Sequence, residues 1–84
     1  YPNPFNPTTN IDFGLPEDSM VDLIIYDILG RKIKYLVKSH QSAGDNSVQW
    51  NATNDLGEPV PAGLYFYTIK AGSFTKTKKM LLIK

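Results

Sequence analysis

The chain carries few side chains that could perform catalysis. His40 is the only histidine among the 84 residues, and there is no cysteine, which excludes a cysteine nucleophile and thiolate metal sites. Triad chemistry would need a nucleophile and a carboxylate to converge on a histidine, and no spacing around His40 indicates this. We therefore interpret His40 as a solvated loop residue. We expect no enzymatic activity, no catalytic residue and no metal centre.

The segment from Asn51 to Glu58 contains the oxygen ligands that calcium prefers. Its residues lack the regular spacing of a calcium-binding loop, so we interpret the segment as a turn, with adventitious calcium as the alternative. Asn51-Ala52-Thr53 also matches the acceptor pattern for N-glycosylation, which is short enough to arise by chance. We expect no cofactor.

Four aromatic residues could form a sugar-binding platform, namely Trp50, Tyr65, Phe66 and Tyr67. Two of them alternate along a strand with core positions, so packing explains most of this set. A carbohydrate-binding module is nevertheless kept as an alternative function.

Basic residues gather near the C-terminal end. Lys70, Lys76, Lys78, Lys79 and Lys84 make the last 15 residues basic without any acid, whereas seven of the eight acids lie at or before Asp55. Lysines on an edge strand commonly block edge-to-edge aggregation, and the formal net charge is only +1. We therefore expect no nucleic-acid partner.

These side chains must be positioned by β-strands, because apolar and polar residues alternate through most of the chain. Met20–Tyr26 is apolar on both faces near its middle, which predicts a central strand. Asp27–Arg31 is typical of a tight hairpin in which Asp27 binds the backbone ahead of it and Gly30 supplies a positive φ. Further strands are predicted over residues 11–15, 32–37, 46–50, 64–70 and 74–83.

Polar and glycine-containing stretches separate the predicted strands. They are residues 16–19, 39–45, 51–63 and 71–73. The fold class is therefore all-β, an immunoglobulin-like antiparallel β-sandwich of about seven strands if residues 5–8 pair at a sheet edge. A helix over residues 28–37 is the competing prediction, because its apolar residues fit a helical period moderately, but Gly30 and the β-branched residues argue against it.

The first seven residues, Tyr1 to Pro7, alternate proline with other residues. Proline lacks a backbone donor and drives the preceding residue towards extended conformations. We expect a stiff lead over residues 1–7, anchored by Tyr1 and Phe5, which indicates a module joined to something upstream. Residues 8–84 form the sandwich, and the whole of 1–84 is expected to be a single domain. The absence of cysteines favours a bacterial source.

Short motifs follow one another in order through the whole chain. They are Tyr1-Pro2-Asn3-Pro4-Phe5-Asn6-Pro7-Thr8-Thr9, Ile11-x-Phe13-x-Leu15-Pro16, Val21-x-Leu23-x-Ile25-Tyr26-Asp27-x-Leu29-Gly30-Arg31, Ala43-Gly44, Val48-x-Trp50, Gly57, Pro59-Val60, Ala62-Gly63-x-Tyr65-Phe66-Tyr67 and Lys78-Lys79-Met80. Together they resemble the type A C-terminal sorting domain of the bacterial type IX secretion system. The region from Gly57-x-Pro59-Val60 to Gly63-x-Tyr65 also resembles the immunoglobulin-like part of the flagellar hook-capping protein.

The resemblance implies a non-catalytic sorting signal. Such domains end exported proteins of the Bacteroidetes and neighbouring phyla, whose parent passes through the periplasm and then reaches the cell surface or the medium. The implied partners are the type IX outer-membrane translocon, a sortase-like protease that commonly removes the domain, and a cargo domain upstream in the same chain.

The resemblance also assigns site residues. Tyr1-Pro2-Asn3-Pro4 corresponds to the opening motif, Asp27 with Gly30-Arg31 to an internal motif, and Gly63-x-Tyr65 to the next. Each also has a structural interpretation, as a stiff linker, a hairpin or a core residue. The candidate residues for translocon recognition are Lys78, Lys79, Met80, Leu81, Leu82, Ile83 and Lys84, and strand addition is a ready docking mode.

Two further functions stay open beside the sorting signal. One is a passive immunoglobulin-like spacer or assembly module, and the other is the carbohydrate-binding module named above. An exposed final strand would also allow a weak homodimer.

Overall fold

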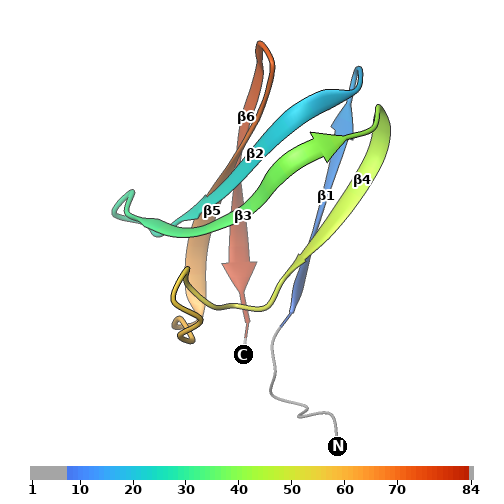
Figure 1. Cartoon of the computed structure of the whole chain (residues 1–84). Helices are drawn as coiled ribbons and strands as arrows, with labels where there is room; N and C mark the ends of the chain where they lie inside the picture. The colour runs from blue at the N-terminus through green and yellow to red at the C-terminus, as the bar shows by residue number, and fades with distance from the viewer. Residues whose placement is uncertain (1–7, 84) are drawn as a thin grey trace, which may run out of the picture.

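A computed structural model describes residues 8–83, which form two antiparallel β-sheets that face each other (Figure 1). Six strands follow one another without an intervening helix in this part of the chain. They are β1 (Thr9–Leu15), β2 (Ser19–Tyr26), β3 (Lys32–Gln41), β4 (Gly44–Trp50), β5 (Gly63–Ala71) and β6 (Phe74–Leu82).

The two sheets differ in width. One contains β1 and β4, and the other contains four strands in the order β3-β2-β5-β6. All pairings are antiparallel. β2 lies between β3 and β5, so both of its edges are paired, and its residues alternate between buried and half-buried positions near the middle. The edge strands of the wider sheet are β3 and β6.

The core lies between the sheets and follows the alternation of each strand. Ile11, Phe13 and Leu15 of β1 face inward, as do Val21, Leu23 and Ile25 of β2. Trp50 is completely buried and is among the largest of the buried side chains. The remaining buried residues are Val37, Ala52, Val60, Tyr65, Tyr67, Ile69, Ala71 and Leu82.

The predicted fold class is confirmed, with differences at particular segments. The competing helix over residues 28–37 is wrong, because residues 27–31 form a turn and β3 begins at Lys32. Six strands are present within residues 8–83, where about seven were expected for the whole chain. The proposed edge strand over residues 5–8 lies largely outside the described residues, and Thr8 is not in a strand.

The polar loop predicted for residues 39–45 is confirmed only at residues 42–43, and the placement of His40 in a loop is wrong because His40 lies in β3. β3 continues to Gln41, which is the register partner of Ser19, and β4 begins at Gly44, the partner of Leu15. Polar residues fit these positions because the ends of both strands lie at exposed sheet edges, where backbone pairing alone maintains the strand. No helix within residues 8–83 is long and apolar enough to cross a membrane.

Candidate functional site

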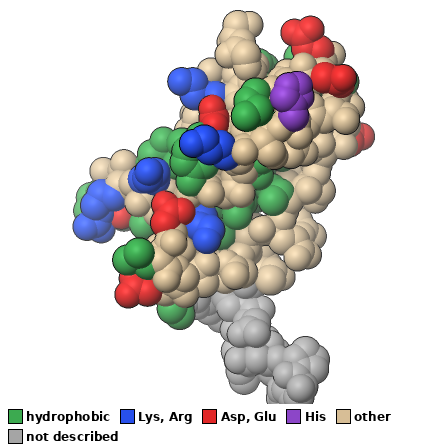
Figure 2. Space-filling view, in the orientation of Figure 1, with side chains coloured by type: hydrophobic (Ala, Val, Ile, Leu, Met, Phe, Trp, Pro, Cys, Tyr) green, Lys and Arg blue, Asp and Glu red, His purple; other side chains and the backbone are tan. Residues whose placement is uncertain are grey.

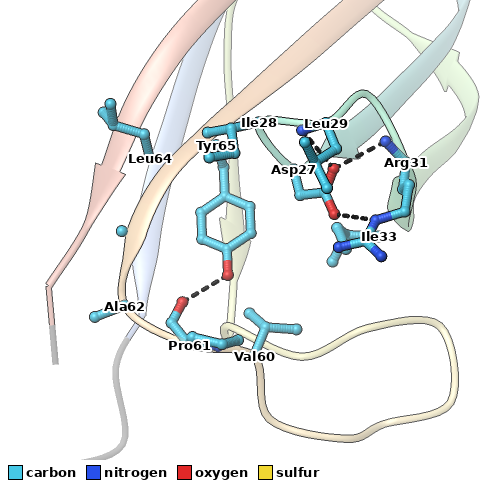
Figure 3. A pocket seen from close by; sticks show the side chains of 11 residues that line it. Asp27, Ile28, Leu29, Arg31, Ile33, Val60, Pro61, Ala62, Leu64 and Tyr65 are labelled. Carbon is cyan, nitrogen blue, oxygen red and sulfur yellow. Dashed lines mark hydrogen bonds and ion pairs between the residues drawn. The ribbon is translucent and has the colours of Figure 1, made fainter.

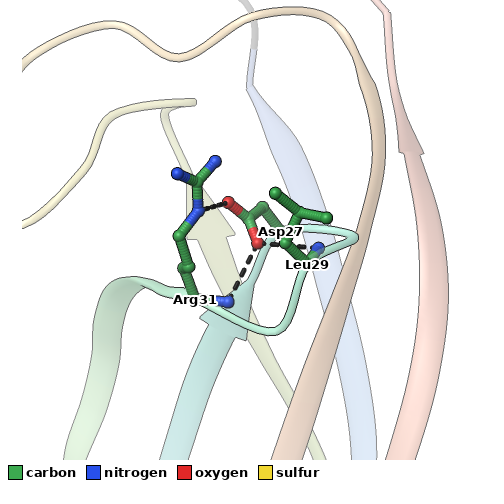
Figure 4. A network of polar contacts seen from close by, with 3 residues as sticks. All are labelled: Asp27, Leu29 and Arg31. Atoms are coloured by element: carbon green, nitrogen blue, oxygen red, sulfur yellow. Dashed lines mark hydrogen bonds and ion pairs between the residues drawn. The ribbon is translucent and has the colours of Figure 1, made fainter.

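The turn between β2 and β3 is organised by the side chain of Asp27. Its Oδ1 accepts hydrogen bonds from the backbone N–H groups of Leu29 and Arg31, each at 2.9 Å (Figure 4). Its Oδ2 accepts a bond from Arg31 Nε at 2.7 Å. Gly30 has a φ of 81°, a conformation that glycine adopts without strain. The hairpin predicted at residues 27–31 is therefore present.

These contacts affect the ionisation of Asp27. Hydrogen bonding from the Arg31 backbone, assisted by the Arg31 guanidinium and the Leu29 N–H, lowers the pKa of the Asp27 carboxyl below its ordinary value. A carboxylate that accepts several N–H bonds is favoured in its charged form. Asp27 consequently holds the turn as an anion at neutral pH.

A second corner held by a hydrogen bond lies just before β5 and includes the first residues of that strand. The hydroxyl of Tyr65 donates a 2.6 Å hydrogen bond to the carbonyl oxygen of Pro61, four residues earlier (Figure 3). The Tyr65 ring packs edge-on against Trp50, with ring centroids 5.2 Å apart. Burial raises the pKa of the Tyr65 hydroxyl. Gly63 begins the strand with a φ of 141°, which a side chain would strain.

The two corners face each other across an open cavity of about 540 Å³, which we call the hollow. One wall consists of Asp27, Ile28, Leu29, Arg31 and Ile33, and the other consists of residues 60–65. Figure 3 shows Tyr65 between the Val60–Pro61 segment and the β2–β3 turn. The internal motif and the Gly63-x-Tyr65 motif, far apart in sequence, therefore line the same feature.

The surface of the hollow is apolar and exposed at the turn. Ile28 and Leu29 are 67% and 72% exposed. On the other wall, Leu64 is 45% exposed. Large apolar side chains gathered at an opening are typical of a surface that a partner covers.

The terminal strand lies beside the hollow. Within β5 and β6, Gly63 pairs with Leu82 and Leu64 pairs with Leu81. Lys78, Lys79, Leu81 and Ile83 are exposed, Met80 is half-buried, and Leu82 belongs to the core. Leu81 thus extends the apolar surface of Leu64. Tyr1, Pro2, Asn3, Pro4 and Lys84 lie outside the described residues.

The oxygen-rich segment after β4 uses its acceptors to hold the chain itself. Asn54 Oδ1 accepts bonds from the N–H groups of Leu56 and Glu58, each at 3.0 Å. Asp55 Oδ1 accepts a 2.9 Å bond from the Tyr35 N–H, which ties this loop to β3. These contacts support the interpretation as a turn.

The remaining chemical alternatives find little support in the geometry. Trp50, Tyr65 and Tyr67 are buried, so they cannot form a sugar-binding platform on the surface. Basic and acidic side chains are interspersed on the face drawn in Figure 2, which gives it no field of a single sign.

Ile28, Leu29 and the Val60–Pro61 wall were not among the site residues predicted from the sequence. A signal was available, because two large apolar residues occupy the tip of a turn, where polar residues are usual. The closure of the hollow by residues 60–62 could not be read from the sequence, since it depends on how the β4–β5 connection folds back.

Comparisons with known proteins agree with the motifs. Residues 1–84 match the secretion system C-terminal sorting domain family. A crystal structure of FlgD from P. aeruginosa is similar, with a TM-score of 0.73 and 25% sequence identity, over 89% of this chain. The match spans only 59% of that FlgD chain. No curated protein matches.

The ordered motifs, the antiparallel sandwich and a family match over all 84 residues lead to one conclusion. This chain belongs to the secretion system C-terminal sorting domain family.

Proposed function

We propose that this domain delivers its parent protein to the type IX outer-membrane translocon, and that the translocon contacts it at the hollow and the adjoining end of β6. Membership of the sorting family supports the first part. Under this proposal, the cargo is the upstream part of the same polypeptide, and a sortase-like protease acts on the delivered protein.

The exposed apolar wall of the hollow carries the second part of the proposal. Ile28 and Leu29 gain little from packing in the free domain because both are largely exposed. Asp27 and Arg31 nevertheless fix the turn that presents them, through three hydrogen bonds. A rigid turn with apolar residues at its tip suits recognition, since a partner that covers them gains apolar burial at a low ordering cost.

The end of β6 adds a second contact surface, in which exposed apolar residues flank a buried one. Leu81 and Ile83 are 58% and 74% exposed, whereas Leu82 is 2% exposed. Leu82 thus packs the core while its neighbours remain open to a partner. Deleting residues 79–84 would remove core packing together with any docking surface, so exposed substitutions give the sharper test.

A reporter-secretion assay tests the proposal at the level of the domain. A fluorescent protein with an export signal is fused to residues 1–84 and expressed in a type IX-competent host and in its translocon mutant. We expect the reporter at the surface or in the medium of the competent host alone. Reporter retained in the periplasm of both hosts, with the domain folded, would reject the sorting function.

A spacer or assembly module is the second candidate, and the structural similarity to FlgD favours it. This function predicts a stable complex with a structural partner and no effect on export. The same reporter assay separates the two candidates, because only the sorting signal changes the location of an unrelated cargo.

A further inference from the structure

The sandwich is open along the side where β1 and β6 lie. β1 pairs with β4 on one side, and no described strand pairs with its other side. A groove of about 160 Å³ lies there, lined by Asp12, Phe13 and Gly14 of β1, Tyr67 and Ile69 of β5, and Phe74, Lys76 and Lys78 of β6. Alternate residues of an unpaired strand edge present free N–H and C=O groups. This groove is separate from the hollow.

The wall formed by β6 has an unusual composition for an inward face. Phe74 and Met80 pack against the core and Leu82 is buried. Because side chains alternate along a strand, Lys76 and Lys78 share that same face. Both are exposed, since the opposing sheet is two strands wide and the sheet containing β6 is four. The inner face of β6 is therefore uncovered where its lysines lie.

The two lysines lack a carboxylate partner within residues 8–83, where Asp27–Arg31 is the ion pair that the structure contains. Asp12 also lines the groove. Burial, and to a lesser extent the negative charge of Asp12, raises the pKa of the Tyr67 hydroxyl. Two lysines against one carboxylate leave the groove with a net positive charge.

We propose that the free edge of β1 accepts an extended segment of a partner polypeptide as a third strand, with two acidic residues at alternate positions above Lys76 and Lys78. Strand addition supplies backbone hydrogen bonds, and inward side chains supply specificity. Apolar residues on either side of the acids would lie above Phe74 and Met80. Facing sheets lie about 10 Å apart, a gap that a lysine and a glutamate can bridge.

A second copy of this chain does not fit as the added strand. No two of its acids lie two positions apart in the sequence, so no segment of it has the required pattern. Direct pairing of two β6 edges is also unfavourable, because it would bring rows of lysines together. The charge pattern therefore selects an acidic partner segment.

The test uses a capped peptide of leucine, threonine, glutamate, threonine, glutamate, threonine and leucine, titrated into the 84-residue chain and followed by NMR. We expect amide shifts concentrated in β1. The K76E/K78E variant should bind the acidic peptide with an affinity lower by about tenfold or more, because two attractive contacts become repulsive. K79E is the matched control on the outer face of the same strand, and it should change the affinity by about twofold or less.

If the acidic peptide binds only weakly, exchanging the charges between the peptide and the protein still gives a clear result. A peptide with lysines in place of the glutamates should bind K76E/K78E and should not bind the original chain. The proposal is overturned if the acidic peptide does not bind, if K79E weakens binding as much as K76E/K78E does, or if the shifts avoid β1. A concentration-dependent dimer that K76E/K78E abolishes would assign the groove to a second copy and would equally overturn it.

Discussion

Single residues fix the two corners of the hollow. Asp27 closes one corner as a carboxylate that accepts three hydrogen bonds, and Tyr65 closes the other through its bond to Pro61. Both residues contribute geometry that positions exposed neighbours. Under the proposed function, their role in recognition is indirect, through the shape of the hollow.

Asp27 should make the stability of the domain depend on pH. Because its pKa is lowered in the folded state, its contribution is present above the unfolded aspartate value of about 3.9 and is lost as the pH falls through the folded value. Asp27→Asn should therefore lower the melting temperature at pH 7, and the difference from the unmodified chain should shrink as the pH falls below about 4. A difference that stays constant across this range would contradict the assigned role.

Tyr65→Phe isolates the hydroxyl contact of the second corner. Losing the bond to Pro61 while keeping the ring should reduce the free energy of unfolding by about 1 kcal/mol, measured by urea denaturation. Tyr67→Phe is the matched control, because the structure gives the Tyr67 hydroxyl no hydrogen-bond partner among residues 8–83. Equal effects of the two substitutions would show that the corner bond has no special role.

At the scale of elements, successive side chains near the end of β6 alternate between the core and the solvent. Leu82 faces the core, and Leu81 faces solvent next to Leu64. Leu82→Ala should cost about 2–5 kcal/mol of unfolding free energy because it leaves a cavity. Leu81→Ala should cost about 0.5 kcal/mol or less. Chemical denaturation of both variants measures this difference, and similar losses would mean that the end of β6 is packed differently.

The elements also show which parts of the fold could be predicted. β2 and the Asp27–Arg31 turn were predictable, because apolar alternation and an Asp–Gly turn pattern act over neighbouring residues. The ends of β3 and β4 near residues 39–45 were not, since Gln41 and Gly44 are strand residues only through pairing with Ser19 and Leu15. Pairing between distant segments overrides a polar local sequence.

The candidate site was predictable only in part for the same reason. The motifs identified Asp27 and Tyr65 separately, whereas their meeting around one hollow depends on the packing of the β4–β5 connection. Alternation along the final strand could have identified Leu82 as a core residue. The exposure of Ile28 and Leu29 follows from their place in a turn. That they form one wall of the hollow could be recognised only once the structure had placed residues 60–65 opposite them.

At the scale of the whole molecule, Trp50 joins the two sheets and the long connection. It pairs in register with Thr9, packs against Tyr65, and donates a 2.8 Å bond from Nε1 to the Thr53 carbonyl oxygen. Trp50→Ala should therefore destabilise the domain by about 3–5 kcal/mol, a large part of the stability of a small domain. A melting curve equal to that of the unmodified chain would contradict this packing.

The whole domain thus consists of a packed sandwich that presents an exposed apolar hollow at one end. Met20, which is 53% exposed, lies at the start of β2, whereas the hollow adjoins the turn at the end of that strand. The M20D variant is therefore a matched surface control, because it replaces an exposed apolar side chain that lies away from the hollow.

The most direct test of the central claim is secretion of the fluorescent reporter carrying I28D/L29D in its sorting domain. We expect that this variant, shown to be folded by circular dichroism, leaves the reporter in the periplasm of a type IX-competent host, whereas the M20D variant is secreted like the original domain. Normal secretion of folded I28D/L29D would contradict recognition at the hollow.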